Sequence, residues 1–71
     1  MKINLFNDEK FSGCYDADKD QWDLYVACAN IDQLPCRVEL SQDSESWWNC
    51  YLVKAQYMRG KGLFHLIYKD F

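Results

Sequence analysis

The chain has 71 residues, of which 17% are aromatic and 27% charged, and its net charge at pH 7 is −3. A chain this short builds one hydrophobic core, so a second domain is excluded and we expect residues 1–71 to form a single compact domain. No apolar run approaches the roughly 18 residues of a membrane span. The apolar stretch at the amino terminus is also too short for a secretory signal, so we expect a cytoplasmic protein without a membrane partner.

Charge is divided unevenly along the chain. Residues 1–50 contain ten acidic and four basic residues, whereas residues 51–71 contain one acidic and four basic residues. The acidic part favours a partner with a basic surface and repels nucleic-acid phosphates, while the basic part could meet phosphates or an acidic protein. A mixed, solvated surface is the plainer explanation of the same charges.

The first predicted strands are short. Residues 2–6 alternate weakly between polar and apolar side chains, and the polar cluster at residues 7–9 ends them as a turn would. Residues 10–15 indicate a second strand, in which Gly13 marks a bulge or a bend.

Two clearer strands follow an acidic turn at residues 16–20. Apolar side chains take every second position in residues 22–28 and again in residues 34–41, which is the period of a half-buried strand. Residues 30–33 form the predicted loop between them, so we expect the two strands to pair as a hairpin. Pro35 has no backbone N–H and is therefore expected at a strand end or a sheet edge.

The segment from Asp43 to Arg59 decides the fold class, because it carries signals for both a helix and a strand. A helix over residues 44–59 would have a capping side chain at its start, Gly60 as its stop and one apolar face. However, its tryptophan, tyrosine, valine and cysteine residues are poor helix formers and mostly good strand formers. We therefore favour a strand.

A hairpin and its returning strand complete the predicted fold. Residues 59–62 alternate basic residues with glycines, as a hairpin tip does, and residues 63–68 are an apolar and aromatic stretch of strand length. About five strands with short connections predict a mainly β fold, a small antiparallel meander or barrel. The alternative is an α+β fold in which an antiparallel sheet carries one helix over residues 44–59.

The residues give little basis for catalysis or metal binding. Cys14, Cys28, Cys36 and Cys50 include no Cys-x-x-Cys pair, and buried thiols are the preferred interpretation. His65 is the only imidazole and lies in an apolar strand, which favours a packed histidine over a general base. We therefore predict a protein that is not an enzyme and that uses no metal and no cofactor.

An acidic group is the first candidate binding site. Asp16, Asp18, Asp20 and Asp23 could imitate nucleic-acid phosphates toward a basic cleft. The first three are spaced as in the opening of a calcium-binding loop, but Gln21 stands where such a loop needs glycine. We therefore expect a solvated acidic turn that docks on a basic partner.

A second candidate site combines aromatic and basic side chains. Adjacent tryptophans in a strand point to opposite faces, so one of the pair at positions 47 and 48 is hard to bury. Exposed aromatic side chains are typical of protein-interface hot spots and of surfaces on which bases stack. The group consists of Trp47, Trp48, Tyr57, Arg59 and Lys61.

These groups lead to two functional hypotheses. The first is a small protein that binds another protein through an acidic and aromatic face and acts by occlusion, such as a phage- or plasmid-type inhibitor of a host enzyme or defence complex. The alternative is a small-barrel reader that binds single-stranded nucleic acid or a peptide through aromatic residues and the basic carboxyl-terminal hairpin. Nucleic acid is the less favoured partner.

Overall fold

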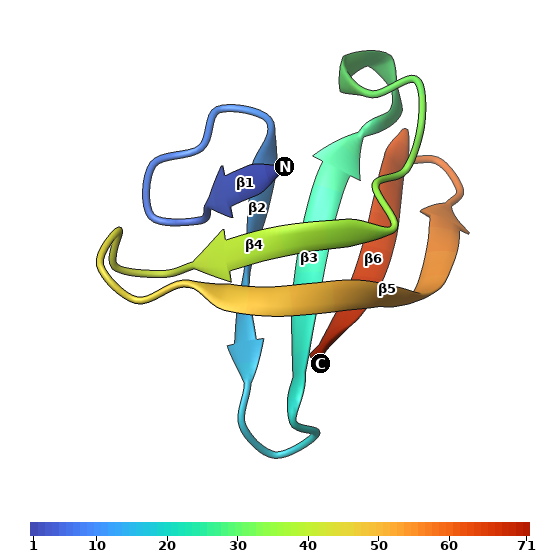
Figure 1. The fold of residues 1–71 in the computed structure, drawn as a ribbon. Coiled ribbons are helices and arrows are strands. Elements are labelled where there is room, and N and C mark those ends of the chain that lie inside the picture. Colours follow the sequence, from blue (N-terminus) through green and yellow to red (C-terminus); the bar gives the residue numbers. More distant parts are fainter.

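The computed structural model describes all residues from Met1 to Phe71, and its six strands form one sheet that nearly closes as a barrel (Figure 1). A single 3-10 turn, η1, covers Cys28–Asn30. The strands are β1 Lys2–Asn4, β2 Phe11–Asp16, β3 Gln21–Ala27, β4 Arg37–Ser41, β5 Trp48–Met58 and β6 Leu63–Asp70.

The strands lie side by side in the order β1, β4, β5, β6, β3, β2. Every pair is antiparallel except β1 and β4, which are parallel. Figure 1 shows β4 and the start of β5 crossing in front of β3 and β6. Strand β5 pairs with β4 through its first residues and with β6 through most of its length. Its pairing with β6 shifts register between Leu52 and Lys54, and such an irregularity bends a strand.

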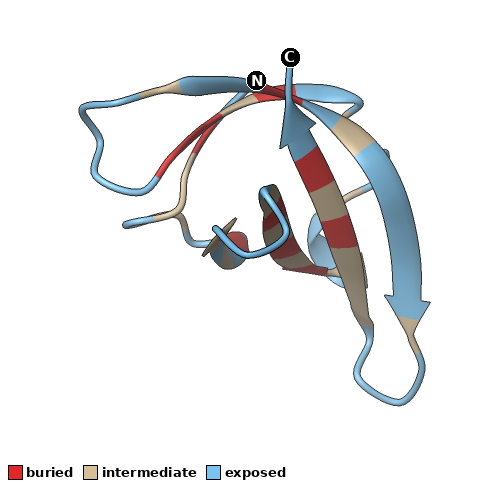
Figure 2. Ribbon diagram, turned by 90° about the horizontal axis from the view of Figure 1, so that it is seen from below, coloured by how far each residue is buried: buried red, intermediate tan, exposed pale blue.

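The core lies on the inner face of this curved sheet, where alternate residues of each strand point. Buried and less buried residues alternate along β3 and β6, whereas most of β5 beyond Leu52 is exposed (Figure 2). Tyr68 is the largest side chain that is fully buried, and its hydroxyl donates a hydrogen bond to the backbone oxygen of Pro35 at 2.7 Å. The apolar core residues are Ile3, Phe11, Trp22, Leu24, Val26, Val38, Leu40, Cys50, Leu66 and Tyr68.

The mainly β prediction is confirmed, and the helix over residues 44–59 is wrong. The helical signals belong to two different elements. Asp43 accepts backbone hydrogen bonds from Glu45 and Ser46, which makes a turn before β5 instead of a helix cap. Strand-forming residues then continue through β5, and the glycine at position 60 lies in the β5–β6 turn.

The predicted hairpin between residues 22–28 and 34–41 is also wrong. Strand β3 pairs with β2 and β6, whereas β4 pairs with β1 and β5, so the two strands are not neighbours. The η1 turn and residues 31–36 carry the chain from one group of strands to the other. In the predicted second strand, Gly13 causes no bulge, because the β2–β3 register is continuous through it.

Candidate functional site

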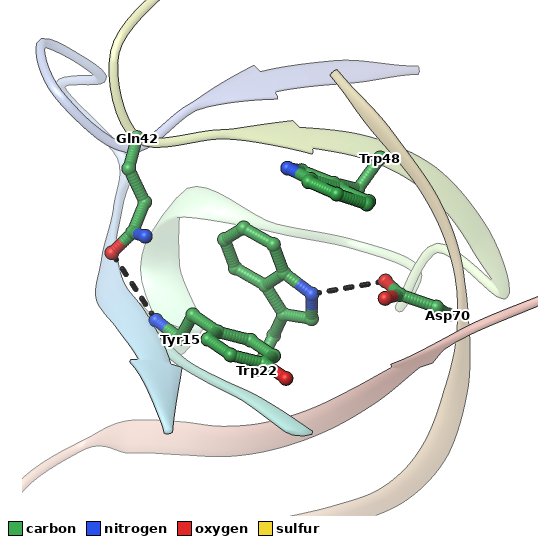
Figure 3. Close-up of a pocket in the computed structure, with 5 residues that line it drawn as sticks. All are labelled: Tyr15, Trp22, Gln42, Trp48 and Asp70. Atoms are coloured by element: carbon green, nitrogen blue, oxygen red, sulfur yellow. Dashed lines mark hydrogen bonds between the residues drawn. The ribbon is translucent and has the colours of Figure 1, made fainter. Parts of the chain in front are cut away.

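One pocket on the protein is walled by aromatic side chains from different strands (Figure 3). Its volume is about 250 Å³, and it lies at the end of the barrel where β2 and β6 end and β3 and β5 begin. We call it the aromatic pocket. It is lined by Tyr15, Trp22, Gln42, Trp48 and Asp70.

Strand register brings two of the rings and the carboxylate together. Tyr15 and Trp22 are cross-strand partners in the β2–β3 pair, with ring centroids 5.2 Å apart and ring planes inclined by 58°. Trp22 in turn pairs with Tyr68 of β6. Asp70 lies two residues beyond Tyr68 and therefore faces the same side of the sheet.

The two tryptophans of the pocket differ in exposure. Trp22 is 3% exposed and forms the floor, whereas Trp48 is 51% exposed and forms a wall. Trp48 faces inward because it stands two positions before the buried Cys50 in β5. A group that enters the pocket would meet a buried ring beneath it and a solvent-accessible ring beside it.

Hydrogen bonds hold the polar lining in place. The indole Nε1–H of Trp22 donates to Asp70 Oδ1 at 3.2 Å, and the Cys50 thiol donates to the same oxygen at 3.2 Å. Gln42 Oε1 accepts the backbone N–H of Tyr15 at 3.3 Å. The second carboxylate oxygen of Asp70, Oδ2, makes no hydrogen bond within the protein.

The turn that joins β2 to β3 adds negative charge beside the pocket. We call residues 16–20 the acidic turn. The Tyr15 hydroxyl donates a hydrogen bond to Asp20. This bond, together with burial and the negative charges of Asp20, Asp70 and Asp16, raises the pKa of Tyr15 to about 12. The raised pKa of Tyr15 therefore reflects the negative charge of three nearby carboxylates.

These carboxylates have no basic partner in the protein. No lysine or arginine forms an ion pair with a carboxylate, and the one contact between a histidine and a carboxylate, His65 with Asp23, lies away from the pocket on the outer face of the sheet. Lys19 lies in the acidic turn without forming an ion pair to any of its carboxylates. Asp16, Asp18, Asp20 and Asp70 outnumber this single lysine, so the region around the pocket has a net negative charge.

Two other surface rings already bear a cation of the chain itself. The Lys2 ammonium lies 5.1 Å from the centroid of the Trp47 ring, and the Arg37 guanidinium lies 5.0 Å from that of Phe71. Arg37 and Phe71 also line a larger hollow of about 400 Å³, so the aromatic face there is covered. The rings of the aromatic pocket bear no lysine or arginine.

The structure gathers three of the four predicted acidic residues. Asp16, Asp18 and Asp20 lie together in the acidic turn, next to the aromatic pocket. Asp23 points to the outer face of β3, where its Oδ1 contacts His65 Nε2 at 2.9 Å and accepts a hydrogen bond from Gln21 at 3.0 Å. The predicted acidic site is therefore smaller than the sequence indicated.

The predicted aromatic and basic group does not form one site. Trp48 lies in the aromatic pocket and Trp47 lies under Lys2. Tyr57 packs edge-on against Phe64 near the other end of β5, roughly 30 Å along the strand from Trp48 at ~3.3 Å per residue. Arg59 and Lys61 follow at the β5–β6 turn.

Four residues of the pocket were missed in the sequence. Tyr15 and Trp22 belong to predicted strands, but alternation predicts only which face a residue takes and not its neighbours across strands. Gln42 and Asp70 carry no local signal at all. Two aromatic residues flanking a short acidic turn, Tyr15 and Trp22, are the one clue that could have pointed to this end of the barrel.

The only histidine has structural partners on the outer face. The His65 imidazole stacks on the Tyr25 ring, with centroids 4.8 Å apart and planes inclined by 10°, and contacts Asp23. No thiol or serine hydroxyl makes a hydrogen bond to it. These contacts account for the histidine as a half-buried packing residue.

The cysteines are all free, and the expectation of buried thiols is correct only for Cys50. Cys14 and Cys36 are exposed, because they lie on the outer face of β2 and just before β4. Burial, the hydrogen bond to Asp70 and the charge of that carboxylate raise the pKa of Cys50 to about 12.

Thiol labelling should therefore separate the cysteines. We expect iodoacetamide at neutral pH to modify Cys14 and Cys36 rapidly in the folded protein and Cys50 only after unfolding, because the thiolate is the reactive form. Peptide mass spectrometry in native buffer and in urea measures this. Fast labelling of Cys50 in native buffer would contradict the burial of its thiol.

No three His, Cys, Asp or Glu side chains come together in an arrangement that could hold a metal ion. The structure also contains no helix with the length and apolar character needed to cross a membrane. No family model matches the chain, and no curated protein or solved structure is significantly similar to it.

Proposed function

We propose that the protein is a binding module that takes a basic segment of another protein onto the end of its barrel. A cationic side chain of that segment enters the aromatic pocket, and the acidic turn attracts the neighbouring positive charges. The observation that carries this proposal is a pocket with three aromatic walls and one carboxylate, Asp70, that has no basic partner.

Both kinds of lining favour a cation. The face of an aromatic ring is electron-rich and attracts a positive charge, by about 0.5–1 kcal/mol at exposed sites and about 2 kcal/mol when water is excluded. Trp22 is buried, so its ring belongs to the case in which water is excluded and the attraction is larger. The carboxylates that raise the Tyr15 pKa add Coulomb attraction at the same place.

The size of the pocket favours a side chain over a free ligand. Pockets for small molecules usually have volumes of about 300–1,000 Å³, and the aromatic pocket, at about 250 Å³, is smaller. Such a space suits the end of one side chain. The remaining affinity would then come from the surface around it, which the acidic turn supplies.

Occlusion is the mode of action that we propose for such a module. A basic segment that is held by the acidic turn and the pocket is no longer accessible to its other partners. The inhibitor hypothesis is one form of this proposal, in which the segment belongs to a nucleic-acid-binding cleft of a host enzyme or defence complex. The three carboxylates gathered at residues 16–20 support that form, because they offer closely spaced negative charges.

Binding of single-stranded nucleic acid is the weaker proposal. Its two tryptophans lie at the start of β5, whereas Tyr57 and the basic residues lie at the other end of that strand and in the turn after it. Trp48, the best placed ring for stacking, stands beside Asp70 and the acidic turn, whose charges repel phosphates.

A charge-matched pair of variants tests the proposed function. Asp18→Asn/Asp20→Asn removes two charges from the acidic turn, and Asn tolerates the positive φ of Asp20 (52°) as Asp does. The control, Glu9→Gln/Asp32→Asn, removes two charges from exposed positions elsewhere. The probe is a fluorescent peptide of alternating lysine and alanine, measured by polarisation at low and at high salt.

We expect the acidic-turn variant to weaken peptide binding about tenfold at low salt and the control to change it less than about threefold, because local charges steer a partner more than net charge does. The difference should shrink at high salt. Equal losses of affinity in the two variants would show that only the net charge of the protein matters and would contradict a specific role of the acidic turn. Absence of peptide binding by the unaltered protein would refute the proposal.

A further inference from the structure

The polar groups that line the aromatic pocket are nearly all used within the protein. Asp70 Oδ1 already accepts two hydrogen bonds, from Trp22 and from Cys50. Gln42 Oε1 accepts the backbone N–H of Tyr15, and the hydroxyl hydrogen of Tyr15 is given to Asp20. The one carboxylate oxygen of the lining that accepts no hydrogen bond within the protein is Asp70 Oδ2.

We propose that the pocket selects an N-methylated lysine side chain and binds the dimethylated form most tightly. This inference rests on the proposed function and specifies its ligand. An unmodified lysine ammonium has three N–H donors, and each donor that loses water without finding an acceptor opposes binding. A dimethylammonium group has one N–H, which matches the one free oxygen of Asp70, and two methyl groups that need no acceptor.

The rings suit the methyl groups. Methylated ammonium groups place their positive charge against aromatic faces and have little water to lose there. The Tyr15 and Trp22 planes are inclined by 58°, and Figure 3 shows the Trp48 ring bordering the same space from another side. Rings that are inclined to one another offer a methylated ammonium, which is charged on all sides, a face in more than one direction, whereas a planar guanidinium stacks best against one flat face. The geometry therefore favours a methylated ammonium over arginine.

The exposure of the walls gives the side chain a way in. Trp22 is buried at the bottom of the pocket, while Trp48, Gln42 and Asp70 are exposed at its rim. A long, unbranched lysine stem can therefore reach the floor while its backbone stays outside, beside the acidic turn.

The test is a titration of the protein with Nα-acetyl-lysine N-methylamide in its unmodified, mono-, di- and trimethylated forms, followed by NMR. The indole N–H signals are the reporters. We expect the signals of Trp22 and Trp48 to move, because their rings line the pocket, and the signal of Trp47 to stay, because that ring lies under Lys2. The dimethyl form should bind about tenfold more tightly than the unmodified form.

Three further comparisons make the test specific. The arginine analogue of the probe should bind more weakly than dimethyllysine, and a neutral analogue with a quaternary carbon in place of the nitrogen should bind weakest. Asp70→Asn should remove the preference for dimethyl over trimethyl, since the N–H then meets a neutral oxygen. Trp48→Ala should weaken the methylated forms about tenfold, and Trp47→Ala, the matched control, should leave them unchanged.

The outcomes separate this inference from the proposed function. Equal binding of unmodified and dimethylated probes, with both pocket indoles moving, would overturn the methyl selectivity and leave a general cation pocket. Equal binding of the arginine analogue would overturn the choice of ammonium over guanidinium. If no cationic probe moves the pocket indoles while the lysine-alanine peptide still binds, the pocket is not the cation site. This inference then fails together with the role of the pocket in the proposed function, and only the attraction of a basic segment to the acidic turn remains.

Discussion

Replacing Gly13 with alanine should unfold most of the protein. A β-carbon at this position would overlap the backbone oxygen of Asp23 and lie 2.9 Å from the Cα of Leu24. Both are backbone atoms of β3, the strand that pairs with β2, so neither can move aside as a flexible side chain would. The φ of Gly13, +149°, is also one that residues with a side chain rarely adopt.

We expect Gly13→Ala to lower the free energy of unfolding by about 4 kcal/mol or more, which approaches the whole stability expected of a domain this small. Urea denaturation followed by far-UV circular dichroism measures the loss. Gly60→Ala is the matched control, because Gly60 also has a positive φ but nothing within 4 Å of its added β-carbon. That variant should lose only about 1 kcal/mol. Equal losses would show that crowding at Gly13 is not the cause.

The second large effect is on stability, and we expect it for one of the two tryptophans of the pocket but not for the other. Trp22→Ala should lower the free energy of unfolding by about 3–5 kcal/mol, because it empties a buried site and removes the hydrogen bond to Asp70. Trp48→Ala should cost about 1 kcal/mol or less, since half of its side chain is already in water.

Urea denaturation followed by circular dichroism suits both variants, because tryptophan fluorescence changes with the substitution itself. The comparison also supports the binding experiments, since it predicts that Trp48→Ala remains folded while its pocket loses a wall. A loss at Trp48 as large as that at Trp22 would contradict the division into a buried floor and an exposed wall.

Local patterns predict the strands of this protein better than their partners. The alternation in residues 22–28 gives β3, Gln21–Ala27, to within one residue, because one face of this strand is buried along its whole length. The segment at residues 44–59 is harder, since a turn-forming acidic and serine-rich stretch also resembles a helix cap. Its aromatic and β-branched residues favour a strand, and that prediction is confirmed by β5.

Pairing is where the sequence says least. The parallel contact between β1 and β4 joins residues 2–4 to residues 39–41, and nothing local marks either partner. The expected hairpin of residues 22–28 and 34–41 assumed that successive strands are neighbours. That assumption fails at η1, where the chain leaves one group of strands for the other.

The candidate site inherits this limit. Strand periodicity predicts that Trp47 and Trp48 point to opposite faces, but the buried position of Cys50 is needed to tell that Trp48 is the inward one. Asp70 reaches the pocket only because β6 pairs with β3 in a register that places Tyr68 opposite Trp22. The acidic turn is the part that was predicted from the residues alone, because its members are consecutive.

The lining of the aromatic pocket runs from residue 15 to residue 70, so almost the entire polypeptide must be in place before the pocket exists. A single hairpin or a shortened fragment of the chain would therefore not form the pocket. Any molecule that occupies the pocket is therefore linked to global unfolding, and a ligand at a hundred times its Kd would add about 2.7 kcal/mol to the stability of the native state. A rise in melting temperature becomes a direct assay for candidate partners.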